Sequence, residues 1–580
     1  MNTIRYKFPL VGRLFVLLCA VTVTSQALWA QSVADSLDTR VIDLWPRWQI
    51  EPKFDFSWVA QDPMPKPVPN LAALNSSVVA ERVEEARRMV VISQHQEFQG
   101  GEEALIVLLE KLKTPTKNRM ELLAYLSGAM ALGSADIAEQ IWTAAQTDLT
   151  AQLAVEGWLI EIRSDLALYK WRKRLQDATE QNESYLIAIE GVGAVGSESD
   201  VPAIQEVVRS STSYLTTRLT ASTALGQLAS DGLESFAQLL LESDLPMREL
   251  LAAKVLAGHT SSEAGQICER ILASEAEVSH GPAFRVLASV DAERARDAAK
   301  NGLLKHPEST VRQLAVEHLA NLDDADSLRA LGFSLRDSNP ETRRTARAAL
   351  QRAYVTHDSV QQFVREAIGF YLQGDFEFGA EQAIVLAASL EMKQFCPRLI
   401  DLLSHPSEGV HVRAAWALQE LVDDVNILGR LMPIAREITS ELEPGDQYIK
   451  DSRVTMLAML FGAFGRNAYM PASEMLLKYV PKNEHIMRDE SRAAAIWALG
   501  RIWADRGNAG LAKQLAKRMT DNNPDDPENK IVKYTSALAL GMLRDPGSVR
   551  RLRSAVADEG IPAPLGYAAT WAIEQYDAAE

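Results

Sequence analysis

Apolar residues follow a helical spacing over residues 308–350, and one phrase occurs there twice. Residues 311–319 read VRQLAVEHL and residues 342–350 read TRRTARAAL, and the two phrases start 31 residues apart. Each contains an arginine, an alanine three residues later and a leucine four residues after that alanine. A second apolar helical pattern lies between them, at Leu328, Leu331 and Leu335. The stretch therefore predicts two helices in each period, and periods of this length are typical of helical solenoids.

The final leucine of the phrase has an apolar equivalent in most of the chain, which we call the anchor of each repeat. The anchors are Leu126, Leu159, Val192, Leu225, Leu256, Leu287, Leu319, Leu350, Leu386, Leu418, Leu460, Leu499, Leu540 and Ile573. Their spacing is 31 to 33 residues up to Leu350 and 32 to 42 residues beyond it. We therefore predict an all-α, α-α superhelical solenoid of about fourteen helical hairpins over residues 76–580.

Small and basic residues also recur at fixed distances from the anchors. Alanine stands four residues before nine of them, as at Ala315 and Ala346, and we expect it to let neighbouring helices approach closely. Arginine stands seven residues before six of them, as at Arg312 and Arg343. On so acidic a chain we interpret this row as arginine–aspartate pairs between repeats rather than as phosphate sites.

Two segments carry the motif in its fullest form, 491–500 (SRAAAIWALG) and 532–541 (VKYTSALALG). They resemble the HEAT-like repeat of the phycobilisome-lyase type, which reads roughly V-R-x-x-A-x-x-A-L-G and continues into a second helix. The resemblance covers about 450 residues at the level of repeat type. It implies the solenoid architecture. It says little about activity, because a fold does not determine a function.

Residues 1–30 have the features of a secretory signal peptide. Arg5, Lys7 and Arg13 precede an apolar core at 14–23, which is too short to span a membrane, and cleavage after Ala27 or Ala30 fits the sequence. No later apolar run is long enough for a membrane span. We therefore expect an exported protein, either periplasmic or secreted.

Residues 31–75 form a segment rich in aromatic residues and proline. The aromatic residues are Trp45, Trp48, Phe54, Phe56 and Trp58. The interspersed prolines disfavour a long helix, so we predict an extended arm. We favour a role in covering the apolar end of the repeat stack, which solenoids require. A partner-binding role for Trp45, Trp48 and Trp58 is the alternative, because exposed aromatic clusters mark interfaces.

Three repeats are lengthened by loops before their first helices, at 441–450, 481–490 and 521–530. Equivalent loops of successive repeats should lie on one edge, and repeat insertions often mark the binding side. Surface drift in loops is the alternative. The last loop is acidic, and we select Asp521, Asp525, Asp526 and Glu528 as candidate contacts to a basic partner. Pro524 and Pro527 interrupt its similarity to a calcium loop, so we expect no metal there.

Motifs for catalysis or cofactor binding are missing from the sequence. There is no H-E-x-x-H, C-x-x-C-H or G-x-S-x-G. Residues 191–196 read GVGAVG, but they follow a helical pattern rather than a strand, so we interpret them as a helix end and not as a dinucleotide site. Trp416, Trp497 and Trp571 each stand two residues before an anchor, which indicates packing between helices.

The net charge restricts the possible partners, and the cysteine content predicts free thiols. The net charge is −17, and loss of residues 1–30 would make it −20, which argues against nucleic acid as a partner. Beyond the signal peptide only Cys268 and Cys396 remain, four repeats apart, and we expect two free buried thiols.

These observations predict a non-catalytic protein-binding scaffold of the cell envelope or periplasm, without a cofactor or a metal. The partner would be a protein, and the acidic loop suggests a basic one. The alternative comes from the resemblance alone. Relatives of the phycobilisome-lyase type attach or remove bilins, which implies a chromophore-lyase or chaperone role.

Overall fold

The structure is a computed structural model. It describes residues 68–577, except 95–97, 115, 117, 178–181, 323, 442–450, 483–488, 505 and 560–563. The chain divides into two compact units, and their described parts are residues 68–318 (unit 1) and 319–577 (unit 2). All regular elements in these residues are helical, so the predicted all-α solenoid is confirmed.

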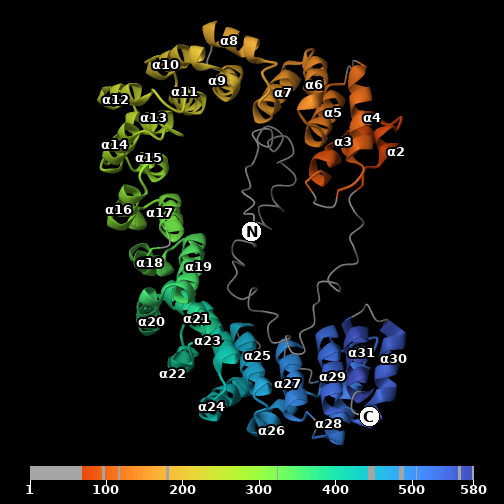
Figure 1. The fold of residues 1–580 in the computed structure, drawn as a ribbon. Coiled ribbons are helices and arrows are strands. Elements are labelled where there is room, and N and C mark those ends of the chain that lie inside the picture. The colour runs from red at the N-terminus through yellow and green to blue at the C-terminus, as the bar shows by residue number, and fades with distance from the viewer. Residues whose placement is uncertain are drawn as a thin grey trace. The chain divides into compact units, whose positions relative to one another are not determined.

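Unit 1 consists of helical hairpins that follow one another along the chain (Figure 1). Its helices are α2 (Leu71–Leu74), α3 (Val79–Ile92), α4 (Gly101–Lys113), α5 (Arg119–Leu132), α6 (Ala138–Ala145), α7 (Leu149–Glu161), α8 (Leu168–Gln176), α9 (Glu183–Val195), α10 (Val201–Arg209), α11 (Leu215–Leu228), α12 (Glu234–Glu242), α13 (Arg248–Val255), α14 (Ser262–Leu272), α15 (Glu277–Val290) and α16 (Ala292–Asn301). Short 3₁₀ turns at Ala135–Ile137, Glu198–Asp200 and Leu303–Lys305 complete it. The helix α17 (Ser309–Leu322) contains the boundary between the units.

Unit 2 continues the same hairpin pattern. Its helices are α18 (Ala325–Leu331), α19 (Pro340–Thr356), α20 (Asp358–Gln373), α21 (Glu377–Ser389), α22 (Cys396–Leu402), α23 (Glu408–Leu421), α24 (Val425–Glu441), α25 (Asp451–Arg466), α26 (Ser473–Leu477), α27 (Asp489–Ile502), α28 (Ala509–Met519), α29 (Lys530–Leu543), α30 (Val549–Glu559) and α31 (Pro564–Asp577). The 3₁₀ helices η6 (Gly332–Arg336), η7 (Lys393–Phe395), η8 (Met470–Ala472) and η9 (Pro546–Ser548) lie between them.

The first helix of each repeat packs on the first helix of the next. In unit 1 these contacts run from α3 through α5, α7, α9, α11 and α13 to α15. In unit 2 they run from α19 through α21, α23, α25, α27 and α29 to α31. Polar side chains begin several of these helices, as where Asn118, Asp148 and Asn182 accept backbone N–H groups in the first turn.

The anchors form the continuous core that their spacing predicts. Each anchor from Leu126 to Leu540 is at most 1 % exposed. Ile573 is only half-buried. All nine alanines four residues before an anchor are fully buried. The motif positions therefore serve packing between helices.

Replacing a buried alanine of this row should overpack the contact between first helices. We expect Ala346→Leu to lower the free energy of unfolding by about 1–3 kcal/mol. Ala348→Leu in the same helix is the matched control, because Ala348 is exposed. Thermal melts of the two variants test this, and equal melting temperatures would contradict the assigned packing.

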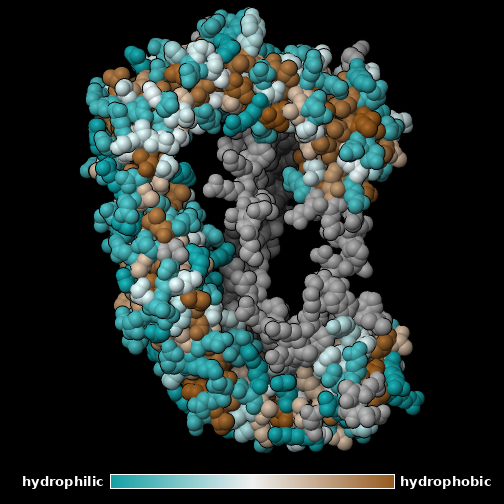
Figure 2. Space-filling view, viewed as in Figure 1, coloured by the Kyte–Doolittle hydropathy of each residue, from teal (hydrophilic) through white to brown (hydrophobic). Residues whose placement is uncertain are grey.

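The segment that was predicted to be an extended arm contains one short helix, α2. The helix α2 lies inside the segment 31–75, and its first turn is capped by Asn70, whose side chain accepts the Ala73 N–H at 3.1 Å. Hydrophobic residues gather on the surface over α2–α5 (Figure 2), and Ile106 is 67 % exposed there. Residues 31–67, with Trp45, Trp48 and Trp58, lie outside the described residues, as does the predicted signal peptide.

The row of arginines seven residues before the anchors forms the predicted pairs between repeats only in part. Arg119 pairs with Asp148 of the next repeat at 3.2 Å, as expected. Arg312 and Arg343 instead donate to backbone carbonyls of the turn before their own helix, at His306 (2.8 Å) and Asp337 (2.7 Å). These guanidinium groups stabilise the turn that starts a repeat, because carbonyl groups there have no helical partner.

Histidine stands at this position in two repeats, as His280 and His411, and His280 takes part in a buried pair. Its Nε2 lies 3.0 Å from the Ser274 carbonyl oxygen, and its Nδ1 lies 3.1 Å from Nε2 of His306. The Glu308 N–H donates to His306 Nδ1 at 3.1 Å. His306 must therefore carry its proton on Nε2 and donate to His280, which in turn donates to Ser274. A proton added to His306 at Nδ1 would face the Glu308 N–H, so this arrangement favours the neutral form of His306.

Unit 1 should lose stability as the pH falls below about 6.5, the ordinary histidine value. Burial and the neighbouring His280 lower the pKa of His306, and they outweigh the opposite effect of Glu277 and Glu308. The unfolded chain therefore binds more protons than the folded one once the pH falls below that value, which destabilises the fold. Burial lowers the pKa of His259 in the same way.

Thermal melts between about pH 7.5 and pH 5.5 test this dependence. His306→Asn is the matched variant, because an amide can accept from Glu308 and donate to His280 without titrating. Its pH dependence should be smaller than that of the wild type, with the contribution of His259 remaining. Identical pH profiles would show that the buried histidine pair does not govern the effect.

Candidate functional site

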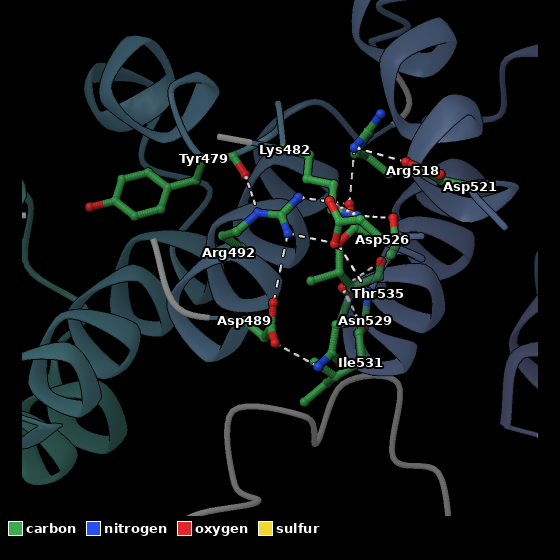
Figure 3. Close-up of polar contacts among 12 residues, drawn as sticks. Tyr479, Lys482, Asp489, Arg492, Arg518, Asp521, Asp526, Asn529, Ile531 and Thr535 are labelled. Atoms are coloured by element: carbon green, nitrogen blue, oxygen red, sulfur yellow. Dashed lines mark hydrogen bonds and ion pairs between the residues drawn. The ribbon is translucent and has the colours of Figure 1, made fainter. Parts of the chain in front are cut away.

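The predicted acidic residues lie in the loop between α28 and α29, which is shown with its neighbours in Figure 3. The Glu528 N–H donates to the Asp521 carbonyl oxygen at 3.1 Å and closes the loop. Inside it, the Asp521 carboxylate accepts the Asn523 N–H at 3.3 Å, and the Asn523 side chain accepts the Asp525 N–H at 3.2 Å. Turns of this kind and joined ends give a compact surface loop.

Glu528 holds this loop onto two helices from inside. Its carboxylate accepts two hydrogen bonds from Arg492 of α27, at 2.7 and 2.8 Å, and one from Arg518 of α28 at 3.1 Å (Figure 3). Glu528 is 3 % exposed. Burial opposes its ionisation, but the hydrogen bonds and charge of Arg492 and the charge of Arg518 together hold the pKa of this carboxyl below its usual value.

This geometry corrects the role that the sequence suggested for Glu528. A carboxylate buried between two guanidinium groups cannot also face a partner protein. Glu528 is a structural anchor of the loop, and the acidic composition of the segment gave no sign of this.

The remaining acidic residues of the loop lie at its surface. Asp521 is half-buried and pairs with Arg518 at 3.3 Å. Asp526 is exposed and pairs with Lys482 at 2.7 Å. Asp525 is exposed, and no ion pair to it occurs within the described residues. The negative charge open to a partner is therefore smaller than the composition indicates, and it centres on Asp525.

Two of the three predicted loops are joined along one edge of unit 2. Lys482 belongs to the loop before α27 and reaches Asp526 across the repeat boundary. Asn529, which caps α29, also donates to Asp489 at 2.6 Å. These contacts agree with a common edge for the loops at 481–490 and 521–530. The third loop lies outside the described residues from 442 to 450.

The basic partners in this loop edge were not selected from the sequence as site residues. Lys482, Arg492 and Arg518 are separated from their acidic partners by 44, 36 and 10 residues. The first two separations correspond to about one lengthened repeat. Aligning the loops by repeat, rather than scanning each loop for charge, would have placed these cations opposite the acidic residues.

The other candidate sites agree with their structural interpretation. Residues 191–195 of the glycine motif end α9, and Gly196 is its C-cap. Burial raises the pKa of the Cys268 thiol to about 12 and that of Cys396 to about 11, and both thiols are free and buried.

Across the described residues, no cluster of three metal-binding side chains occurs, and no helix is long and apolar enough to cross a bilayer.

A family model described as the Armadillo/beta-catenin-like repeat matches residues 393–423. This range covers η7, α22 and α23, one complete hairpin. No curated protein matches the chain.

Several solved structures are similar to this chain at low sequence identity. An engineered protein is 17 % identical and has a TM-score of 0.31, and the match covers 65 % of this chain and 99 % of that one. Yeast importin-beta (Kap95p) is 13 % identical, with a TM-score of 0.46 and coverage of 87 % and 72 %. Kap121p bound to Pho4p is 11 % identical, with a TM-score of 0.47 and coverage of 87 % and 56 %. One hairpin of the chain therefore matches an armadillo-type repeat, and the helical hairpins of the described residues agree with that repeat type. The phycobilisome-lyase type is not shown.

Proposed function

We propose that this chain is a non-catalytic protein-binding scaffold that works in the cell envelope or periplasm. The observation that carries the proposal is the loop between α28 and α29. Its ends are joined, Glu528 fixes it to two helices, and residues 522–527 are exposed. A loop held this firmly presents its surface with little loss of conformational freedom on binding.

The partner in this proposal is a protein with a basic patch. Asp525 offers an exposed carboxylate that has no ion pair among the described residues, and Asp526 adds a second one that Lys482 partly neutralises. Attraction between exposed charges weakens with salt, so the interaction should be salt-dependent. Export rests on the sequence of residues 1–30. The described residues contain no feature that favours the chromophore-lyase alternative over a scaffold.

Charge reversal at the loop tip tests the proposal better than shortening the loop, because shortening would remove the buried Glu528. We expect Asp525→Lys to reduce cross-linked capture of the native partner from the envelope. Its stability should change by less than about 0.5 kcal/mol, as is usual for exposed positions. The measurements are mass spectrometry of the captured protein and a thermal melt.

Glu437→Lys on α24 is the matched control, because Glu437 is exposed on a second helix away from this loop. It makes the same charge change and should leave capture intact. Equal capture by the wild type and Asp525→Lys at low salt would remove the loop from the proposal. A visible absorption band in the purified protein would instead support the chromophore alternative.

A further inference from the structure

Four planar side chains form a continuous stack on unit 2, away from the loop described above. The guanidinium of Arg336 lies over the ring of Phe333 at 4.3 Å and over the ring of Phe376 at 4.5 Å. Phe370 extends this cluster, because its ring stacks with that of Phe376 with the two ring centroids 6.0 Å apart. We call these four residues the arginine–phenylalanine stack. They come from η6, α20 and the N-cap of α21, and both η6 and α20 contact α21.

The rings of this stack are exposed to an extent that is unusual for phenylalanine. Phe370 is 57 % exposed, and Phe333 and Phe376 are each 38 % exposed. Large apolar side chains are normally buried, so three exposed rings in one place need an explanation outside the core. Aromatic residues and arginine are the types most enriched at protein interfaces and their energetic centres.

The scaffold beneath the stack is fixed by buried contacts. Tyr371, which follows Phe370, is 4 % exposed, and its hydroxyl donates to the Gly332 carbonyl oxygen at 2.9 Å. Gly379 leaves room for the Tyr371 ring, because a Cβ there would lie 2.3 Å from it. These contacts join η6 to α20 and α21. The stack is therefore held in place before any ligand binds, which lowers the entropic cost of binding.

Arg336 has an unused capacity for hydrogen bonding. Its guanidinium lies close to two aromatic rings, which leave its planar set of N–H donors without an acceptor. Within the described residues, Arg336 makes no hydrogen bond and no ion pair. A carboxylate is the group that matches such donors, because it can accept two parallel bonds.

Acidic residues around the stack restrict what can bind. Asp375 and Glu377 flank Phe376, and Asp337 follows Arg336. Asp375 is exposed and does not pair with Arg336, so the donors stay open although an acid stands nearby. A ligand with several negative charges, such as a nucleic acid, would be repelled by these carboxylates. A single carboxylate with apolar neighbours fits both the donors and the rings.

We propose that the arginine–phenylalanine stack is a docking surface for a protein segment that carries one carboxylate beside apolar side chains. The carboxylate binds the in-plane donors of Arg336, and the apolar side chains cover Phe370 and Phe333. This surface is separate from the loop between α28 and α29. It binds a negatively charged group, whereas the loop is proposed to bind a positively charged one.

Selection from a displayed library of random peptides on the immobilised full-length protein tests the proposal. We expect enriched peptides to contain aspartate or glutamate next to an aromatic or aliphatic residue. For an enriched peptide, Arg336→Gln should weaken binding about tenfold or more, as at an interface hot spot. Arg336→Lys should weaken it too, because an ammonium group lacks the planar fork.

The decisive measurement combines changes on both sides. Replacing the acid of the peptide by its amide and replacing Arg336 by glutamine should not have additive effects, because both remove the same contact. Arg365→Gln is the control, since Arg365 lies over the Tyr354 ring outside the stack. The proposal is overturned if no peptide is enriched, if the enriched peptides lack acids, or if the two effects add. Melting curves of the variants verify that each one is folded.

Discussion

Replacing Glu528 by glutamine should lower the free energy of unfolding of unit 2 by about 3–5 kcal/mol. The change removes one charge and leaves Arg492 and Arg518 in place, which are 3 % and 7 % exposed. Arg518 would keep its ion pair with Asp521 at 3.3 Å and Arg492 a longer one with Asp489 at 3.7 Å, but neither acid replaces the buried carboxylate between the two guanidinium groups. The amide of glutamine can accept only part of the hydrogen bonding that the carboxylate accepts from the two guanidinium groups.

Hydrogen exchange of α27, α28 and α29 is the most direct measurement, because repeat proteins open locally and a single global transition need not report on one hairpin. Exchange of these helices should accelerate in Glu528→Gln. Asp525→Asn is the matched control in the same loop and should leave exchange unchanged, since its side chain is exposed. Equal protection in both variants would mean that the buried network contributes little.

The same site predicts a dependence on acidic pH. The pKa of the Glu528 carboxyl is lower in the folded chain than in the unfolded one. Its contribution to stability is therefore complete above about pH 4.5, the ordinary value for glutamate, and is lost as the pH falls through the folded pKa. Glu528→Gln should lack this part of the acid transition in a denaturation series.

The fold was predictable from the sequence because its determinants repeat. An anchor such as Leu319 and an alanine such as Ala315 recur at fixed positions, and each is buried for the same reason in every repeat. Trp497 and Trp571 also pack between helices as predicted, against Gly465 and Gly541 of the neighbouring repeats. Because the same pattern occurs in many repeats, the predicted architecture does not depend on the interpretation of any single residue.

The polar contacts were predicted less well because they depend on the path of the chain between helices. Arg312 and Arg343 bind the carbonyls of a turn, whose direction the apolar pattern does not encode. Glu528 looked solvated because its own segment is polar, and its partner Arg492 is 36 residues away. A local window of sequence contains only one side of such a pair.

The arginine–phenylalanine stack was missed for a related reason. Phe333 and Phe370 fit the apolar pattern of helices that pack in a core. Their exposure follows from how η6, α20 and α21 meet, which also leaves Arg336 between two rings. Spacing along one helix cannot distinguish an apolar residue in the core from one at an exposed junction.

Glycine directly after the anchor also determines how closely neighbouring first helices pack, and a substitution there should have a large effect. A Cβ on Gly541 would lie 2.7 Å from the Ala572 Cα of the next first helix, and a Cβ on Gly193 would lie 2.7 Å from the Ala224 Cα. The atoms that would clash belong to the backbone, so they cannot turn away. Both glycines immediately follow an anchor, which explains the leucine–glycine or valine–glycine pair at the end of the motif.

Gly541→Leu should therefore destabilise unit 2 by about 3 kcal/mol or more, at the upper end of overpacking costs. Even Gly541→Ala should destabilise, although alanine is the better helix former by about 1 kcal/mol. Gly510 in α28 is the matched control, because it is exposed and no backbone atom lies near its Cβ position. There the change to alanine should stabilise. Melting temperatures that shift in the same direction at both glycines would contradict the close contact between α29 and α31.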